Sequence, residues 1–168
     1  MNERKESTTS IILEYVRVIV LTVIATFIFL QFVQISRVNG SSMENTYFQN
    51  NIVLIDKVFY KHSQPKRNDI IIVDYDDGLD DTLIIKRVIA VGGDHLDIKN
   101  NEVYINGKKI KESYIKENMN TEDISIDIPK GKVFVMGDNR NHSLDSRKLG
   151  YFDFDNDVIG KVFFKIPL

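Results

Sequence analysis

The stretch that decides the fold runs from Leu83 to Gly107 and reads LIIKRVIAVGGDHLDIKNNEVYING. It holds three short apolar runs, and each ends at a tight-turn sequence: Gly92-Gly93-Asp94, Asn100-Asn101 or Asn106-Gly107. Asn-Gly between two such runs is a strong signal for a two-residue hairpin loop. The stretch therefore predicts a meander of short antiparallel strands.

The chain on both sides of this stretch, beyond Arg37, shows the same pattern. No amphipathic helical period separates the runs, which is typical of an antiparallel β-barrel or folded sheet. A length of 168 residues leaves room for one compact, mainly β domain and a short appendage. We expect further strands at 52–60, 69–73, 124–128, 133–136 and 158–166, and a polar loop or short helix at 110–122.

The appendage is N-terminal, where Val18 to Leu30 (VIVLTVIATFIFL) carries no charge. A membrane-spanning helix needs roughly 17 to 25 residues, so this run is long enough once its flanks lie at the interfaces. The sequence predicts a cytoplasmic segment at 1–14, a transmembrane anchor at 15–35 and an extracytoplasmic domain at 36–168. A cleaved secretory signal and a buried core helix are the alternatives, although the bulky Gln31–Ile35 does not suit a cleavage site.

Charges that flank the apolar run indicate its orientation. Arg4, Lys5 and Arg17 precede or begin it, whereas Arg37 stands alone near its far end. The positive-inside bias then leaves the N-terminus in the cytoplasm and the β domain outside, at the plasma membrane.

The overall composition excludes several classes of protein. The formal net charge is -2, from 22 basic and 24 acidic residues, so no basic surplus indicates a nucleic-acid partner. With no cysteine, the chain has no disulfide, thiolate metal site or cysteine nucleophile. The acidic run Asp74–Asp81 is most simply a solvated loop that lacks the full calcium-loop pattern, and we expect no metal and no cofactor.

Two features are candidates for catalysis. Gly40-Ser41-Ser42-Met43 follows the anchor and is either a simple turn or a flexible run that presents a hydroxyl. Lys86 and Arg87 lie inside an apolar strand, where alternation puts them on opposite faces, so one cation must face apolar neighbours. Burial would lower the pKa of such a lysine and make it a base for serine. The alternative is an edge strand whose two cations both reach water.

A third feature is the polar loop from Gly137 to Arg147, which combines a glycine with acids, arginines and serines. It can be an ordinary surface loop with ion pairs such as Asp145 with Arg147. A loop held rigid by such pairs is also what support of an active site requires.

These runs together resemble the type I signal peptidases, over nearly the whole chain. Ser42 stands in the nucleophile position of that family and Lys86 in the position of its base. The motifs that carry the resemblance are Val38–Thr46, Ile85–Ile89, Gly137 through Gly150, and Asp69–Val73 preceded by Pro65-Lys66-Arg67.

The resemblance implies a membrane-bound serine endopeptidase that removes N-terminal signal peptides from exported precursors. It implies that Ser143 orients Lys86, that Asp145 and Arg147 brace the loop, and that no histidine is the base. Its partners would be signal-peptide-bearing precursors and the lipid bilayer, and the enzyme would work as a monomer near the secretion machinery. The substrate-binding residues it implies are Met43, Ile70, Ile71, Ile72, Val73, Ile84 and Ile85.

The sequence also departs from the family pattern. Gly40 offers no side-chain hydroxyl for an oxyanion hole, so backbone amides must suffice. The other departures, which bear on local backbone geometry and catalytic efficiency, are Asn45, Asn68, Ala90 and Gly92. They keep open the alternative function, a catalytically weak or inactive membrane-tethered paralogue that binds exported chains.

Overall fold

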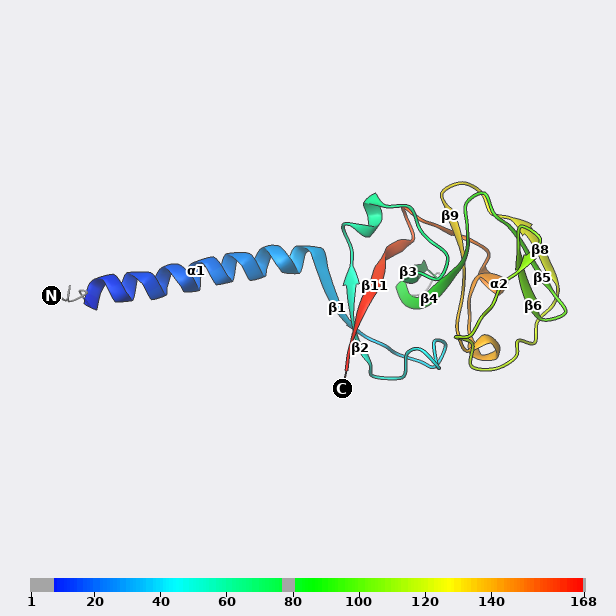
Figure 1. Cartoon of the computed structure of the whole chain (residues 1–168), viewed down its shortest axis with the longest axis horizontal. Coiled ribbons are helices and arrows are strands. Elements are labelled where there is room, and N and C mark those ends of the chain that lie inside the picture. The colour runs from blue at the N-terminus through cyan, green and yellow to red at the C-terminus, as the bar shows by residue number, and fades with distance from the viewer. Residues whose placement is uncertain (1–7, 77–80, 168) are drawn as a thin grey trace.

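A computed structural model describes residues 8–76 and 81–167. One long helix projects from a β-rich domain built of two antiparallel sheets (Figure 1). The N-terminal helix is α1 (Thr8–Phe32), and it passes directly into the first strand, β1 (Val33–Arg37). The mainly antiparallel β fold expected from the sequence is confirmed.

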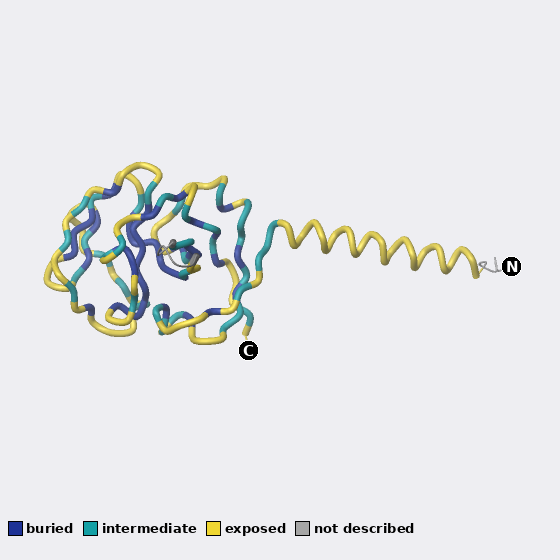
Figure 2. Tube along the Cα trace, turned by 180° about the vertical axis from the view of Figure 1, so that it is seen from behind, coloured by how far each residue is buried: buried dark blue, intermediate teal, exposed yellow. Residues whose placement is uncertain are grey.

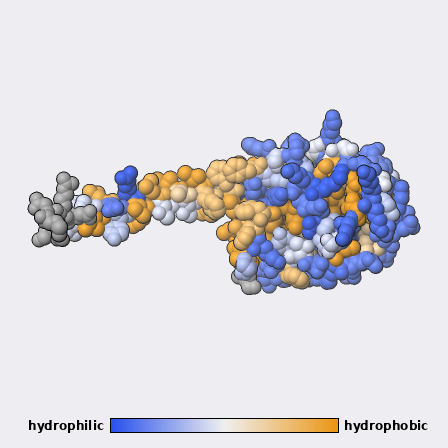
Figure 3. All heavy atoms as spheres, in the orientation of Figure 1, coloured by the Kyte–Doolittle hydropathy of each residue, from blue (hydrophilic) through white to orange (hydrophobic). Residues whose placement is uncertain are grey.

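Helix α1 is long and apolar enough to cross a membrane, and none of its residues is buried against the domain (Figure 2). Its bounds are Thr8–Phe32, and the predicted membrane anchor at 15–35 stays a prediction. Residues 33–35, which the sequence assigned to the anchor, lie instead in β1 and pair with the next strand. The apolar surface of α1 continues onto the adjoining end of the domain (Figure 3), where Phe32 stacks on Phe59.

The larger sheet carries the candidate catalytic lysine in its interior. Its seven strands have the order β1-β2-β11-β3-β4-β9-β10, so β4 lies between two hydrogen-bonded neighbours. Their bounds are β2 (Ile52–Asp56), β3 (Ile70–Asp76), β4 (Asp81–Val91), β9 (Lys132–Met136), β10 (Phe152–Asp153) and β11 (Val158–Ile166).

The predicted meander leads from β4 into the smaller sheet, which has the order β7-β6-β5-β8. Its bounds are β5 (His95–Lys99), β6 (Glu102–Ile105), β7 (Lys108–Lys109) and β8 (Ile124–Asp127). The predicted turn residues Asn100, Asn101 and Asn106 have positive φ, as tight turns between such strands require. Both sheets are open, and within 8–76 and 81–167 no barrel closes, so the folded-sheet alternative holds.

Several predicted boundaries were wrong. The strand expected at 52–60 ends at Asp56, because the Asp56 carboxylate accepts bonds from the backbone N–H of Val58 and Phe59 and starts a turn. The chain then forms η1 (Tyr60–His62). The solvated loop expected at 74–81 is shorter, since Asp74–Asp76 ends β3 and Asp81 begins β4, while 77–80 lie outside the described residues.

The last polar motif is also partly helical, with η2 (Arg140–His142) and α2 (Ser146–Leu149). Residues 110–122 form the loop alternative, without a helix.

A buried apolar cluster fixes the chain that follows the anchor. Val38, Met43 and Tyr47 pack with Ile72 and Ile85 of the neighbouring strands β3 and β4. Burying each large aliphatic side chain contributes about 1.5–3 kcal/mol. The segment that holds Ser42 is therefore attached to the strand that holds Lys86.

Candidate active site

The segment around Ser42 is a compact turn. The backbone N–H of Glu44 donates to Ser41 O, and the N–H of Tyr47 donates to Met43 O. Gly40, just before it, has φ of 87°, a left-handed conformation that glycine adopts without a side-chain penalty. The Gly40 N–H donates to Gln49 Oε1 at 2.6 Å. No local sequence signal indicates this role of Gln49.

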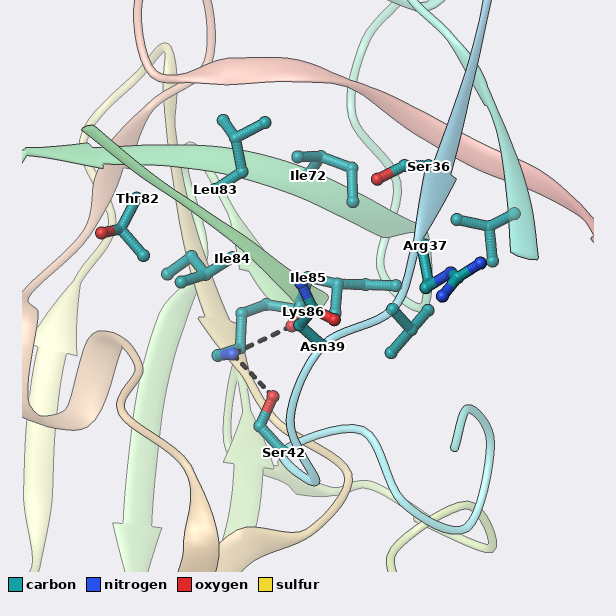
Figure 4. Close-up of a pocket in the computed structure, with 12 residues that line it drawn as sticks. Ser36, Arg37, Asn39, Ser42, Ile72, Thr82, Leu83, Ile84, Ile85 and Lys86 are labelled. Carbon is teal, nitrogen blue, oxygen red and sulfur yellow. Dashed lines mark hydrogen bonds between the residues drawn. The ribbon is translucent and has the colours of Figure 1, made fainter. Parts of the chain in front are cut away.

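Lys86 points from β4 toward this turn (Figure 4). Its ammonium nitrogen Nζ lies 2.9 Å from Ser42 Oγ and 2.9 Å from the carbonyl oxygen of Ile85. The residue is only 3% exposed. Burial lowers the pKa of Lys86 to about 8, although the negative charge of Asp145 opposes that shift. The structure thus brings together the two residues expected to form the dyad.

Arg87 is buried on the opposite face of the same strand, at 7% exposure. Its guanidinium makes two 2.7 Å bonds to the Asp138 carboxylate and lies 3.9 Å from the centre of the Tyr114 ring. The sequence predicted that one of the two cations would face apolar neighbours, whereas both are buried. The edge-strand alternative is wrong, because β4 is paired on both sides by β3 and β9.

The loop from Gly137 to Arg147 is braced around Asp145. The buried Asp145 carboxylate accepts the Gly137 N–H at 3.0 Å and two bonds from the Arg147 guanidinium at 2.8 and 2.9 Å. Burial raises the pKa of Asp145, but the bonds and charge of Arg147 outweigh it and hold that pKa below its usual value. A side chain at Gly137 would collide with Ser42 O and Ser143 Oγ, so glycine permits the loop to approach Ser42.

Ser143 was expected to hydrogen-bond and orient Lys86. Its hydroxyl is buried beside Gly137 and helps to hold the pKa of Asp145 low, although within the described residues it makes no hydrogen bond of good geometry. No bond from Ser143 to Lys86 is present within 8–76 and 81–167, and the orienting role of Ser143 stays a prediction.

Asn139 is a residue that sequence reasoning did not single out. Its backbone N–H donates to Ser42 O at 3.0 Å, and its side-chain Nδ2 donates to Ser41 O at 3.0 Å. It is 1% exposed. Its place inside the last motif was the available signal, but the motif alone did not show which atoms it would contact.

A cleft opens beside the dyad, between the chain after α1 and the start of β4 (Figure 4). Of the expected substrate-binding residues, Ile72, Ile84 and Ile85 line it, whereas Ile70 does not. Met43, Ile71 and Val73 are buried in the apolar core and do not line the cleft, so their role in substrate binding stays a prediction. Strand alternation turns Ile71 and Val73 to the other face of β3. The lining residues that were missed are Ser36, Arg37, Val38, Asn39, Val53, Thr82 and Leu83.

The departures from the family pattern have local explanations. Asn68 has φ of 73° and Asn45 has φ of 90°, conformations that asparagine tolerates better than most residues. Proline, fixed near −65°, cannot adopt the Asn45 conformation, so the backbone at this point differs from one that carries proline. Gly92 packs so closely on the backbone of Pro129 and Lys130 that a side chain would collide.

Among the described residues, the side-chain partner of Ser42 Oγ is Lys86 rather than a histidine. His142 is exposed, and His95 pairs with Asp127 on the smaller sheet. Within the described ranges, no group of three potential ligands among histidine, aspartate and glutamate is placed to hold a metal ion.

Comparison with known proteins agrees with this arrangement. Residues 12–166 match the family model described as "Signal peptidase, peptidase S26". The chain belongs to this family, which confirms the resemblance drawn from its motifs.

Individual relatives carry the same name. "Signal peptidase I P" of Bacillus subtilis subsp. natto is 33% identical, with 95% of this chain and 91% of that protein covered. "Signal peptidase I" of Bacillus licheniformis is also 33% identical, with coverages of 90% and 87%. A crystal structure of a signal peptidase I from Enterococcus faecalis V583 superimposes with a TM-score of 0.52 at 28% identity, covering 60% of this chain and 98% of that one.

Proposed function

We propose that this membrane-anchored peptidase removes signal peptides from exported precursors with Ser42 as nucleophile and Lys86 as general base. One observation carries the assignment: a buried lysine nitrogen lies 2.9 Å from the Ser42 hydroxyl. Family membership supports a peptidase that removes signal peptides, and does not favour the alternative of an inactive binder.

The proposed reaction has two halves. Ser42 Oγ attacks the scissile carbonyl carbon while neutral Lys86 takes the hydroxyl proton, and the resulting ammonium then gives a proton to the leaving amine. This leaves the signal peptide bound to Ser42 as an ester. Lys86 next takes a proton from water, the hydroxide attacks the ester, and the proton returns to Ser42 Oγ as the carboxylate product leaves.

The lowered pKa makes this base available near neutrality. With a pKa of about 8, roughly one tenth of the Lys86 side chains is neutral at pH 7. An unperturbed lysine would be neutral in only a few cases per ten thousand. Burial therefore raises the fraction of active enzyme by more than about a hundredfold.

The cleft supports a preference for small side chains near the cut. Ile72 and Ile85 of the packed sheet line it. Displacing packed strands to admit a larger side chain would cost free energy. Small residues are expected at the first and third positions before the cleaved bond. A precursor with phenylalanine in place of alanine directly before that bond should be cut at least about tenfold more slowly.

The anchor sets the proposed location. Helix α1 is long and apolar enough to span the plasma membrane, with the N-terminus in the cytoplasm and the β domain outside. The enzyme is proposed to work there as a monomer near the secretion machinery.

Cleavage of a model precursor by the full chain in detergent tests the assignment. The parent should cut it, and Ser42→Ala should abolish cleavage while leaving the melting temperature close to that of the parent. Cleavage that persists in Ser42→Ala would contradict the nucleophile. A folded parent that binds the precursor without cutting it would instead support the paralogue alternative.

A further inference from the structure

Asn139 contacts both peptide groups that flank the nucleophile. Its Nδ2 donates to Ser41 O, and its backbone N–H donates to Ser42 O, each at 3.0 Å. Ser41 O also accepts the Glu44 N–H, so two donors hold that carbonyl. The acceptor fixes the orientation of the Asn139 amide, because only its nitrogen can donate to a carbonyl oxygen.

Holding the Ser41 carbonyl also determines where the Ser42 N–H points. The peptide bond is planar and trans, so the C=O of Ser41 and the N–H of Ser42 point in opposite directions. Within the described part of the chain, no acceptor for the Ser42 N–H is present. That N–H is the donor required by an oxyanion beside Ser42.

We infer that Asn139 is a positioning residue for the oxyanion hole, acting through its side-chain amide on the peptide between Ser41 and Ser42. The inference rests on the proposed function. Gly40 makes this role more important, since glycine has no hydroxyl to share the oxyanion. The backbone amide must bind the developing charge, and a misaligned amide loses much of that stabilisation.

The Asn139 side chain can be removed without dismantling the loop. Asp145 still binds Gly137, and Arg87 still binds Asp138. The Asn139 backbone bond to Ser42 O also remains in any variant that keeps the backbone. A variant without the Asn139 side chain should therefore still fold. The change should affect only the orientation of the peptide group between Ser41 and Ser42.

The test compares Asn139→Ala and Asn139→Asp with Asn141→Ala in the full chain. Asn141 is an exposed control in the same loop, and its side chain bonds Asn118 O and the Asn120 N–H. Loss of an oxyanion donor costs about 10²–10³ in kcat, and loss of its alignment should cost roughly 10–100-fold. KM should stay within about twofold for both Asn139 variants, and Asn141→Ala should keep kcat within about twofold of the parent.

A second measurement separates positioning from general loosening. A peptide aldehyde that ends at the cleavage position forms a tetrahedral adduct with Ser42, so its affinity reports on the oxyanion hole. It should weaken in both Asn139 variants by about the same factor as kcat. Binding of an uncut precursor peptide, measured in a Ser42→Ala background, should be unchanged by Asn139→Ala. The pH midpoint of kcat in Asn139→Ala should also stay near that of the parent, since this change adds no charge and Asn139 makes no bond to Lys86 in the described structure.

Two results would overturn the inference: kcat within about twofold of the parent in both Asn139 variants, or equal weakening of aldehyde and uncut peptide. Asn139→Asp keeps the size of the side chain and turns an oxygen toward Ser41 O, so it covers the case in which alanine leaves a damaging cavity. A parent that fails to cut the precursor, as Ser42→Ala does, would show that the proposed function itself has failed.

Discussion

Lys86 and Arg87 are neighbours on one strand, and both are buried cations on opposite faces of the sheet. Arg87 is neutralised by two bonds to Asp138, and its charge is further covered by the Tyr114 ring. The direct bonds of Lys86 are to a hydroxyl and a carbonyl, while Asp145 acts on it through its charge.

The difference lies in the direct partner rather than in burial. A buried guanidinium bonded to a carboxylate holds structure together, as in the Arg87–Asp138 pair. A buried lysine that lacks such a bond favours the neutral amine, which can accept a proton. The two faces of β4 therefore differ: the proposed base lies on one face, and a buried ion pair lies on the other.

The largest expected effect concerns Lys86, on the face of β4 that carries the proposed base. Lys86→Arg keeps the charge, but a guanidinium with a pKa above about 12 cannot act as a base. Both Lys86→Arg and Lys86→Ala should lower the initial rate of precursor cleavage at least about a thousandfold. His142→Ala and His95→Ala should remain active. Cleavage by Lys86→Arg together with loss in His142→Ala would indicate a serine/histidine site instead.

The next effect concerns Arg87, on the face of β4 that carries the buried ion pair. Arg87→Met leaves the Asp138 carboxylate buried without its partner, which should lower the free energy of unfolding by about 3–5 kcal/mol. Chemical denaturation of the full chain in detergent would measure it. Lys109→Met, which breaks the exposed pair with Glu102, should cost far less. Similar losses in the two variants would mean that burial of the Arg87 pair is not what makes it structural.

Lys86→Met should change stability in the opposite direction from Arg87→Met. Because the Lys86 pKa is about 8 in the folded protein and 10.5 when unperturbed, burying its charge costs up to about 3 kcal/mol at neutral pH. That cost is fully present below pH 8. It disappears as pH rises toward 10.5, since the unfolded chain then binds the proton more tightly than the folded one.

The methionine variant should therefore be more stable at pH 7, and its advantage over the parent should shrink between pH 8 and 10.5. Denaturation curves at a series of pH values would measure this. An advantage that does not depend on pH would show that Lys86 is not buried as a strained cation.

The smallest effect is a shift in the pH profile. The Asp145 charge raises the Lys86 pKa, so Asp145→Asn should move the midpoint of cleavage activity below its value near pH 8. Asp153→Asn, which alters the half-buried pair with Lys132, should leave the midpoint unchanged. The melting temperature should fall in Asp145→Asn, because Arg147 loses its carboxylate partner. If the midpoint does not move, the proposed electrostatic interaction between Asp145 and Lys86 is wrong.

Local sequence signals predicted much of this molecule. The hairpin turns at Asn100-Asn101 and Asn106-Gly107 depend on neighbouring residues, so the smaller sheet followed from the sequence. Strand β1 did not, because Val33 and Ile35 continue the apolar character of the anchor. Their strand conformation depends on pairing with β2, which is a tertiary contact.

The candidate site likewise combines residues that local sequence predicts with contacts that depend on the tertiary fold. Ser42 and Lys86 were found through motifs, but their supports depend on which distant segments meet. The Arg87–Asp138 pair joins residues 51 positions apart, and the Asn139–Ser41 bond joins residues 98 positions apart. No local pattern specifies such partners. If the face of β3 that lines the cleft had been known, strand alternation would have predicted Ile72 as a cleft residue and excluded Ile71.

Because α1 passes directly into β1, the distance between the end of the helix and Ser42 is limited. Helix α1 ends at Phe32, β1 begins at Val33, and no linker separates them. Ten residues lead from Phe32 to Ser42, five of them held in β1, so the nucleophile lies within about 35 Å of the helix end. With α1 as the proposed anchor, only a peptide bond presented at this fixed height above the bilayer is within reach. The distance of the cut from the membrane is thus set by the fold of the enzyme, independently of the side chains that the cleft prefers.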